Sequence, residues 1–214
     1  MSASLRLRDR QLHYHSSINP EDCIMIASPR PIYLTPEQYL AMEQKSQIKH
    51  EYIDGEVYAM AGASDAHVTI SLNIASALRT HLRNSGCRVY IADMKARIKS
   101  LNRFYYPDVM VTYDERDKNR DNSKQFPCLI IEVLSDSTEA FDRGDKFIDY
   151  QQIETLTEYV LVNTKRPRID AFRRNEEGLW LLQSYTVAES FELKSIGFTD
   201  TMDMMYEDVS FPEE

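Results

Sequence analysis

Cysteine is scarce in this chain and follows no recognisable pattern. The 214 residues contain three cysteines, which are widely separated and odd in number: Cys23, Cys87 and Cys128. Zinc sites are recognised by close cysteine spacings, and disulfide frameworks by an even set of cysteines. The sequence indicates neither, and we expect the three thiols to be small buried side chains.

Long apolar runs and an excess of basic residues are also absent. No stretch approaches the roughly 20 apolar residues of a membrane span, and residues 1–17 lack the apolar block of a signal peptide. We therefore expect a soluble, cytoplasmic protein with no membrane partner. The net charge of −9 counts against a large non-specific nucleic-acid surface, because phosphate binding depends on Lys and Arg. A nuclease remains compatible with it, since carboxylates that hold a metal make the balance acidic too.

Hydrophobic residues make up 43% and charged residues 28% of the chain, which suits one domain with an ordinary core. Residues 1–33 show no clear periodicity and are expected to form a mobile or loosely docked N-terminal arm. A single domain is expected over 34–214. The charged stretch 114–124 is expected to be a solvated loop.

The order of expected elements indicates a mixed α/β domain, in which helices cover one central sheet. A helix capped by Thr35 is expected near 36–44, and a hairpin turns at Asp54-Gly55. Ser64 or Asp65 begins a second helix with an apolar face that includes His67. The remaining expected elements are strands at 88–98, 105–112, 127–134, 158–164, 168–174 and 179–185, a third helix at 135–153, and a short helix within 198–208.

Two acids stand in the most apolar expected strands. Asp108 follows Pro107 in "FYYPDVMVTYD", and Glu132 lies in "CLIIEVL". A buried ionised carboxylate needs a cation, a hydrogen-bond network or a solvent-filled cleft. Two such acids on neighbouring strands are typical of a hard-metal site, because Mg²⁺ takes one or two carboxylates and completes its shell with water and phosphate. For Asp108, backbone donors at a strand end are the alternative partners.

A cation near these acids is expected from one of two lysines. Lys146, on the third helix, comes alongside Glu132 if that helix folds back over the sheet; otherwise it faces solvent and pairs with Asp142. Lys95 lies opposite Asp108 if the hairpin between the strands 88–98 and 105–112 is centred between residues 101 and 102. A surface salt bridge is the alternative for Lys95.

The ordered set "EYIDGEVYAMAGASDAH", "YPDV", "LIIEVLSDST", "DRGDKFIDYQQI" and "EYVLV" resembles the Uma-two-type endonuclease family, also known as domain of unknown function eight-twenty. The resemblance covers roughly residues 33–195. It implies a restriction-endonuclease-like fold of the PD-(D/E)XK superfamily, with Asp108 and Glu132 as its acids. The superfamily lysine position holds Leu134, so the resemblance points to members whose lysine has moved to the next helix, here Lys146.

The resemblance also implies a metal-dependent endonuclease that hydrolyses DNA, with Mg²⁺ or Mn²⁺ bound by Asp108 and Glu132. Glu56 is implied as an extra acid and His67 as a further site residue; the alternatives are a solvated hairpin charge and a core histidine. A second function is a catalytically impaired nuclease fold that binds nucleic acid or protein, which the missing strand lysine and the negative charge favour. We also expect a homodimer built on exposed strands.

Overall fold

The computed structural model of this chain describes residues 33–211. Its contacts divide the chain into two units, Met1–Pro31 and Ile32–Glu214. The predicted N-terminal arm, residues 1–33, lies outside the described residues except for Tyr33, so the fold below is that of the second unit.

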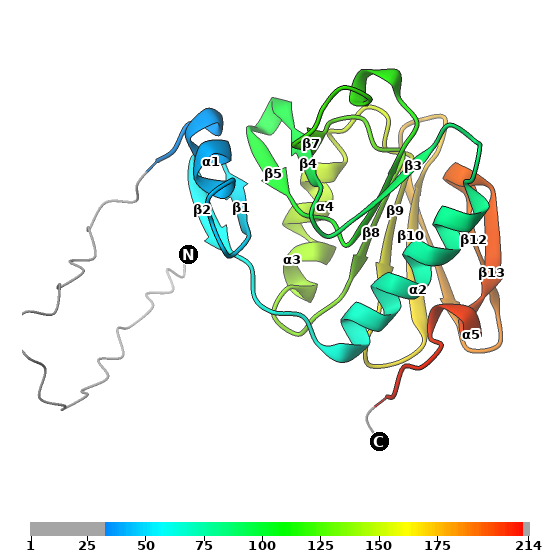
Figure 1. Ribbon diagram of the computed structural model, residues 1–214. Helices are drawn as coiled ribbons and strands as arrows, with labels where there is room; N and C mark the ends of the chain where they lie inside the picture. The colour runs from blue at the N-terminus through cyan, green and yellow to red at the C-terminus, as the bar shows by residue number, and fades with distance from the viewer. Residues whose placement is uncertain (1–32, 212–214) are drawn as a thin grey trace, which may run out of the picture. The chain divides into compact units, whose positions relative to one another are not determined.

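A mixed sheet of six strands forms the centre of this unit (Figure 1), in the order β11-β10-β9-β8-β6-β3. β8 and β9 run parallel, and the other neighbouring strands are antiparallel. The strands are β3 (Arg88–Ile91), β6 (Val109–Thr112), β8 (Leu129–Val133), β9 (Glu158–Val162), β10 (Arg168–Arg174) and β11 (Trp180–Thr186). The predicted α/β class and its central mixed sheet are confirmed.

Two smaller sheets accompany the central one, where the sequence had indicated a single sheet. One has the order β2-β1-β5-β4-β7, and the other pairs β12 with β13. Their strands are β1 (His50–Ile53), β2 (Glu56–Ala59), β4 (Lys95–Ile98), β5 (Arg103–Tyr105), β7 (Ser123–Lys124), β12 (Ser190–Leu193) and β13 (Phe198–Thr201). The predicted hairpin at Asp54-Gly55 is confirmed as β1 and β2.

The helices are short apart from α2. They are α1 (Pro36–Glu43), α2 (Asp65–His81), α3 (Glu139–Arg143), α4 (Asp145–Tyr150) and α5 (Met202–Met205), with 3-10 turns η1 (Lys99–Leu101), η2 (Glu115–Asp117) and η3 (Lys194–Ile196). The predicted cap at Thr35 is confirmed, and it forms a capping box with Gln38 at the start of α1. No helix within residues 33–211 has the length and apolarity that crossing a membrane requires.

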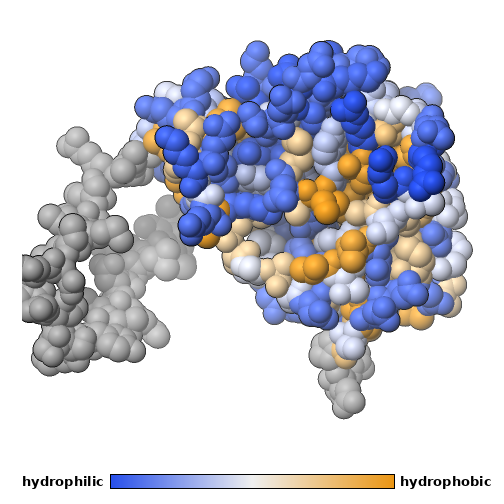
Figure 2. Space-filling model, in the orientation of Figure 1, coloured by the Kyte–Doolittle hydropathy of each residue, from blue (hydrophilic) through white to orange (hydrophobic). Residues whose placement is uncertain are grey.

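Opposite faces of the central sheet pack against different helices. Val109 and Ile131 belong to a core that α2 shares, whereas Met110 and Ile130 belong to one that α4 shares. Side chains alternate along a strand, so Glu132 lies on the same face as Ile130 and points towards α4. On the other face, Figure 2 shows apolar patches where α2 crosses the surface, and Val68 and Leu72 of α2 are exposed.

Three expected elements are divided or reshaped in the structure. The predicted strand 88–98 becomes β3 and β4 on either side of Ala92, which has a positive φ of 39°. The predicted strand 105–112 becomes β5 and β6, separated at Pro107, which has no N–H for a sheet ladder. The predicted third helix is α3 and α4, which meet at Gly144.

The stretch 114–124 is not wholly the solvated loop that its charges predict. Asp117 and Lys124 are buried. The Asp117 carboxylate accepts hydrogen bonds from the backbone N–H groups of Gln125 and Phe126, both at 2.9 Å, and Lys124 donates to the Asp117 carbonyl at 2.8 Å. These charged groups are satisfied by the backbone of the loop itself, so they fix its shape.

Candidate active site

Asp108 and Glu132 lie close together, Asp108 immediately before β6 and Glu132 near the end of β8. β6 pairs with β8 in a register that places Val109 opposite Ile131. Asp108 comes one residue before this ladder, and Glu132 one residue after Ile131, so the two acids are neighbours across the two strands. Asp108 Oδ2 accepts a hydrogen bond from the backbone N–H of Val133 at 2.7 Å. The backbone partner considered for Asp108 is therefore present, and it occupies only one of its two oxygens.

Lys146 lies at the centre of a group of acids. Its Nζ is 3.0 Å from Glu132 Oε1, 3.1 Å from Glu51 Oε1 and 3.3 Å from Asp142 Oδ1. The predicted approach of Lys146 to Glu132 is confirmed, and so is its pairing with Asp142 one helical turn earlier. The lysine side chain is only 7% exposed, so the solvent-facing alternative is wrong.

Three carboxylates contact this one lysine, and Asp108 adds a further negative charge near Glu132. Burial raises the pKa of Glu132 well above its ordinary value; Lys146 opposes this, and the neighbouring Asp142, Asp108 and Glu51 raise it further. Burial alone would lower the pKa of Lys146, yet Glu132, Glu51 and Asp142 raise it well above its ordinary value. The group therefore favours additional positive charge.

The donor set fits a hard divalent cation that is only partly bound by protein. Mg²⁺ takes oxygen ligands and commonly uses one or two carboxylates, with water and phosphate for the rest. Among residues 33–211, no three His, Cys, Asp or Glu side chains are arranged to hold a metal ion by themselves. Asp108 and Glu132, which lie close together among further acids, match the smaller protein contribution that Mg²⁺ or Mn²⁺ needs.

His67 contacts Asp108 directly. It lies in the first turn of α2, where the Ser64 side chain caps the helix by accepting a hydrogen bond from the His67 backbone N–H. His67 Nε2 is 2.8 Å from Asp108 Oδ1. Its Nδ1 is buried and has no hydrogen-bond partner in the described part of the chain. The histidine is thus brought to the acids, and its contact restrains the second oxygen of Asp108.

The expected position of Lys95 opposite Asp108 is wrong. β4 pairs with β5 so that Ala96 faces Tyr105, which centres the turn between Ser100 and Leu101, one residue earlier than expected. The turn contains the 3-10 segment η1 and then Asn102 in the left-handed region, a shape that hydrophobic patterning does not reveal. Lys95 Nζ instead lies 4.9 Å from the centre of the Tyr106 ring.

Glu56 is not brought to the acids, whereas Glu51 is. Glu56 begins the edge strand β2 and accepts a hydrogen bond from the Tyr58 hydroxyl. Glu51 lies in β1, between β2 and β5, and its Oε1 also accepts from the Tyr106 N–H at 3.3 Å. Glu51, and not the Glu56 that the resemblance implies, is therefore the hairpin acid that reaches Lys146. Asp142 is buried rather than a surface partner of Lys146, and the spacing of four residues is the signal that connects the two.

The family assignment agrees with this geometry. The Uma2 family model, whose description is "Putative restriction endonuclease", matches residues 36–203. The chain belongs to the Uma2 family. It is 40% identical over 178 residues to uncharacterized protein slr1290 of Synechocystis sp., covering 83% of this chain and 94% of that one. A second Synechocystis relative, uncharacterized protein sll1609, is 35% identical over 152 residues, or 70% of this chain and 85% of the relative.

A solved structure supports the fold of this Uma2 chain. It is the crystal structure of "a putative nuclease belonging to DUF820" from Anabaena variabilis, with a TM-score of 0.68 and 12% sequence identity. The match covers 81% of this chain and 97% of the Anabaena chain. At this identity the likeness concerns the fold, and it supports the restriction-endonuclease-like architecture inferred from the sequence.

Proposed function

We propose that this protein is an endonuclease that hydrolyses phosphodiester bonds in DNA, with Mg²⁺ or Mn²⁺ held by Asp108 and Glu132. The observation that carries the proposal is the group of three carboxylates around the buried Lys146, with Asp108 near Glu132, where acidic groups outnumber the one lysine. Membership of the Uma2 family, whose description is "Putative restriction endonuclease", supports the same activity.

Each residue of the site has a distinct part in this proposal. When bound, the metal ion supplies activation of water and polarisation of a phosphate oxygen. Asp108 and Glu132 bind the ion, and His67 restrains Asp108. Lys146 neutralises charge that develops on the phosphate, while Glu51 and Asp142 hold its ammonium group in place.

The test is cleavage of supercoiled and linear DNA with Mg²⁺ or Mn²⁺. We expect Asp108→Asn and Glu132→Gln each to reduce cleavage by about 100-fold or more, because each removes an ionic ligand of a metal ion that would stabilise the transition state by several kcal/mol. Glu177→Gln is the matched control, since Glu177 is exposed in the turn between β10 and β11. Activity that survives equally in all variants would be contamination, and a wild type without metal-dependent cleavage would refute the proposal.

A non-catalytic binding module is the second candidate, and one observation favours it. Val68 and Leu72 are exposed on α2, the helix that carries His67, and exposed apolar side chains together with a net charge of −9 suit a protein partner better than DNA. Such a module would show no cleavage in the assay above and no loss of partner binding in Glu132→Gln.

The homodimer and the cytoplasmic location stay predictions.

A further inference from the structure

We propose that Tyr150 is a positioning residue of this site, whose hydroxyl acts with Lys146 to hold Oε1 of Glu132 and so reserves Oε2 for the metal ion. The inference rests on the proposed function, because it concerns how a metal ligand is oriented. It adds a residue that touches neither the ion nor the substrate.

Two donors from one helix converge on one oxygen of Glu132. The Tyr150 hydroxyl donates to Glu132 Oε1 at 2.9 Å, and Lys146 Nζ is 3.0 Å from the same atom. Residues four apart in a helix lie on the same face, so α4 presents both groups to β8 together. No hydrogen bond or ion pair among residues 33–211 involves Oε2 of Glu132.

The Tyr150 ring is held so that its hydroxyl has little freedom. The residue is 0% exposed. Its ring meets Tyr105 edge to face, with centroids 5.5 Å apart, and lies 5.5 Å from Tyr159.

Lys146 alone would orient Glu132 less firmly. Its ammonium group also forms ion pairs with Glu51 and Asp142, so the side chain can shift towards either of these acids and away from Glu132. The Tyr150 hydroxyl has Glu132 as its hydrogen-bond partner in the described structure. Removing that hydroxyl should let the carboxylate rotate, while the packing of the aromatic ring is preserved.

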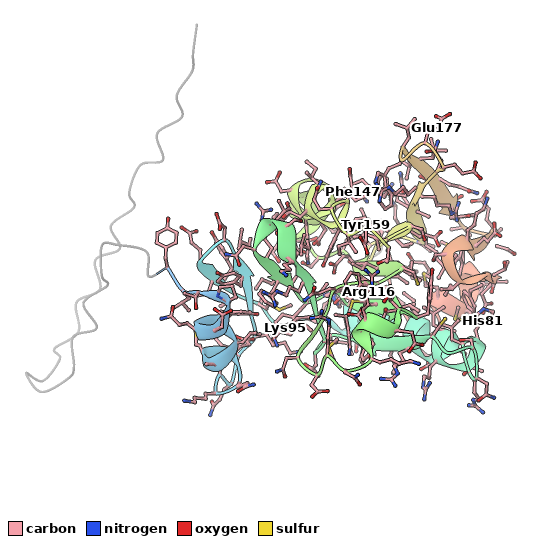
Figure 3. The ribbon with its side chains drawn as sticks, turned by 90° about the horizontal axis from the view of Figure 1, so that it is seen from above. His81, Lys95, Arg116, Phe147, Tyr159 and Glu177 are labelled. Atoms are coloured by element: carbon pink, nitrogen blue, oxygen red, sulfur yellow. The ribbon has the colours of Figure 1, made fainter. Side chains whose placement is uncertain are left out.

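A matched control is provided by Tyr159 on β9. This tyrosine is also 0% exposed, and its hydroxyl donates to a backbone carbonyl, that of Asp142, at 2.8 Å. Figure 3 shows Tyr159 beside Phe147 in the interior, and their rings are stacked with centroids 5.0 Å apart. Tyr159→Phe therefore removes a buried hydrogen bond without touching either proposed metal ligand.

The experiment measures Mn²⁺ binding to the full chain by the electron paramagnetic resonance signal of free Mn²⁺, without DNA. We expect Tyr150→Phe to weaken binding by about 10- to 100-fold, the effect typical of a lost partner of a ligand, and Tyr159→Phe to leave it unchanged. Thermal unfolding of both variants shows whether each is folded and how similar their losses of stability are.

The outcomes separate this inference from the proposed function. Wild-type binding in Tyr150→Phe, equal weakening in the two variants, or no Mn²⁺ binding by the wild type would each overturn the positioning role. If Mn²⁺ binds and Tyr150→Phe weakens it, but no variant cleaves DNA, the positioning role stands and the proposed nuclease activity fails. If wild type and Tyr150→Phe bind Mn²⁺ equally well and cleave DNA equally well, the positioning role fails and the proposed nuclease activity stands.

Discussion

Lys146 is the residue on which the candidate site depends most. Glu132 and Asp142 are each 3% exposed, and Lys146 is the cation that contacts both of them within the described structure. A buried charge left without its partner is far less favourable than the intact pair, because the interior cannot solvate it. The lysine therefore carries a structural role in addition to its proposed catalytic one.

Replacing Lys146 by methionine should destabilise the protein by about 3–5 kcal/mol, since the change leaves buried carboxylates uncompensated. Lys95→Met is the control: Lys95 is similarly buried but lies over the Tyr106 ring and forms no ion pair within the described residues. Urea unfolding measures both. Equal losses of unfolding free energy in the two variants would contradict this account of Lys146.

At the residue scale, the sequence allowed three members of the group to be predicted. Asp108 and Glu132 stand out because an acid in an apolar strand needs a partner, and Lys146 follows from the helix after β8. Glu51 was not predicted as a member, because its approach depends on β1 pairing with β5, where Tyr52 faces Phe104. That pairing joins segments about 50 residues apart, and no local pattern encodes it.

At the scale of elements, the start of α2 connects helix stability with the site. The Ser64 side chain accepts a hydrogen bond from the His67 N–H at 3.3 Å, which satisfies one of the free donors of the first turn. His67 then reaches Asp108 from this same turn. The cap therefore fixes both the beginning of the helix and the place of its histidine.

Ser64→Ala should lower the free energy of unfolding by about 1 kcal/mol, because alanine cannot cap the helix. Ser64→Asn should retain the stability, since asparagine caps about as well as serine. Chemical denaturation of the two variants gives the comparison. If alanine proves as stable as asparagine at this position, the cap contributes nothing measurable.

Elements were predicted well where periodicity and caps decide them, and poorly where the chain changes sheets. The capped helices α1 and α2 and the strands β9, β10 and β11 match expectation. The stretches 88–98 and 105–112 each read as one strand because their apolar character is continuous, yet each supplies the central sheet and the five-stranded sheet in turn. The apolar pattern of a segment indicates which of its side chains are buried, but it does not indicate which other strand the segment pairs with.

At the scale of the whole molecule, the described contacts place the start of the folded unit a little before residue 34. The Leu34 N–H donates to the Gly55 carbonyl at 2.8 Å, and the Tyr52 hydroxyl donates to the Leu34 carbonyl at 2.8 Å. Leu34 also packs against the cluster of Tyr39, Tyr52 and Phe104. These contacts tie the segment before α1 to the hairpin that carries Glu51.

Two truncations test this boundary. A chain of residues 32–214 keeps the contacts of Leu34, so it should unfold at the same urea concentration as the full chain. A chain of residues 35–214 loses both hydrogen bonds, each of which contributes about 1 kcal/mol, together with the packing of Leu34, so it should be less stable by about 2 kcal/mol or more. Because β1 carries Glu51, the shorter chain should also bind Mn²⁺ more weakly.

Equal stability of the two truncated chains would show that the hairpin keeps its position without Leu34. A loss of stability already present in the chain 32–214 would show that residues 1–31 contribute to the free energy of unfolding.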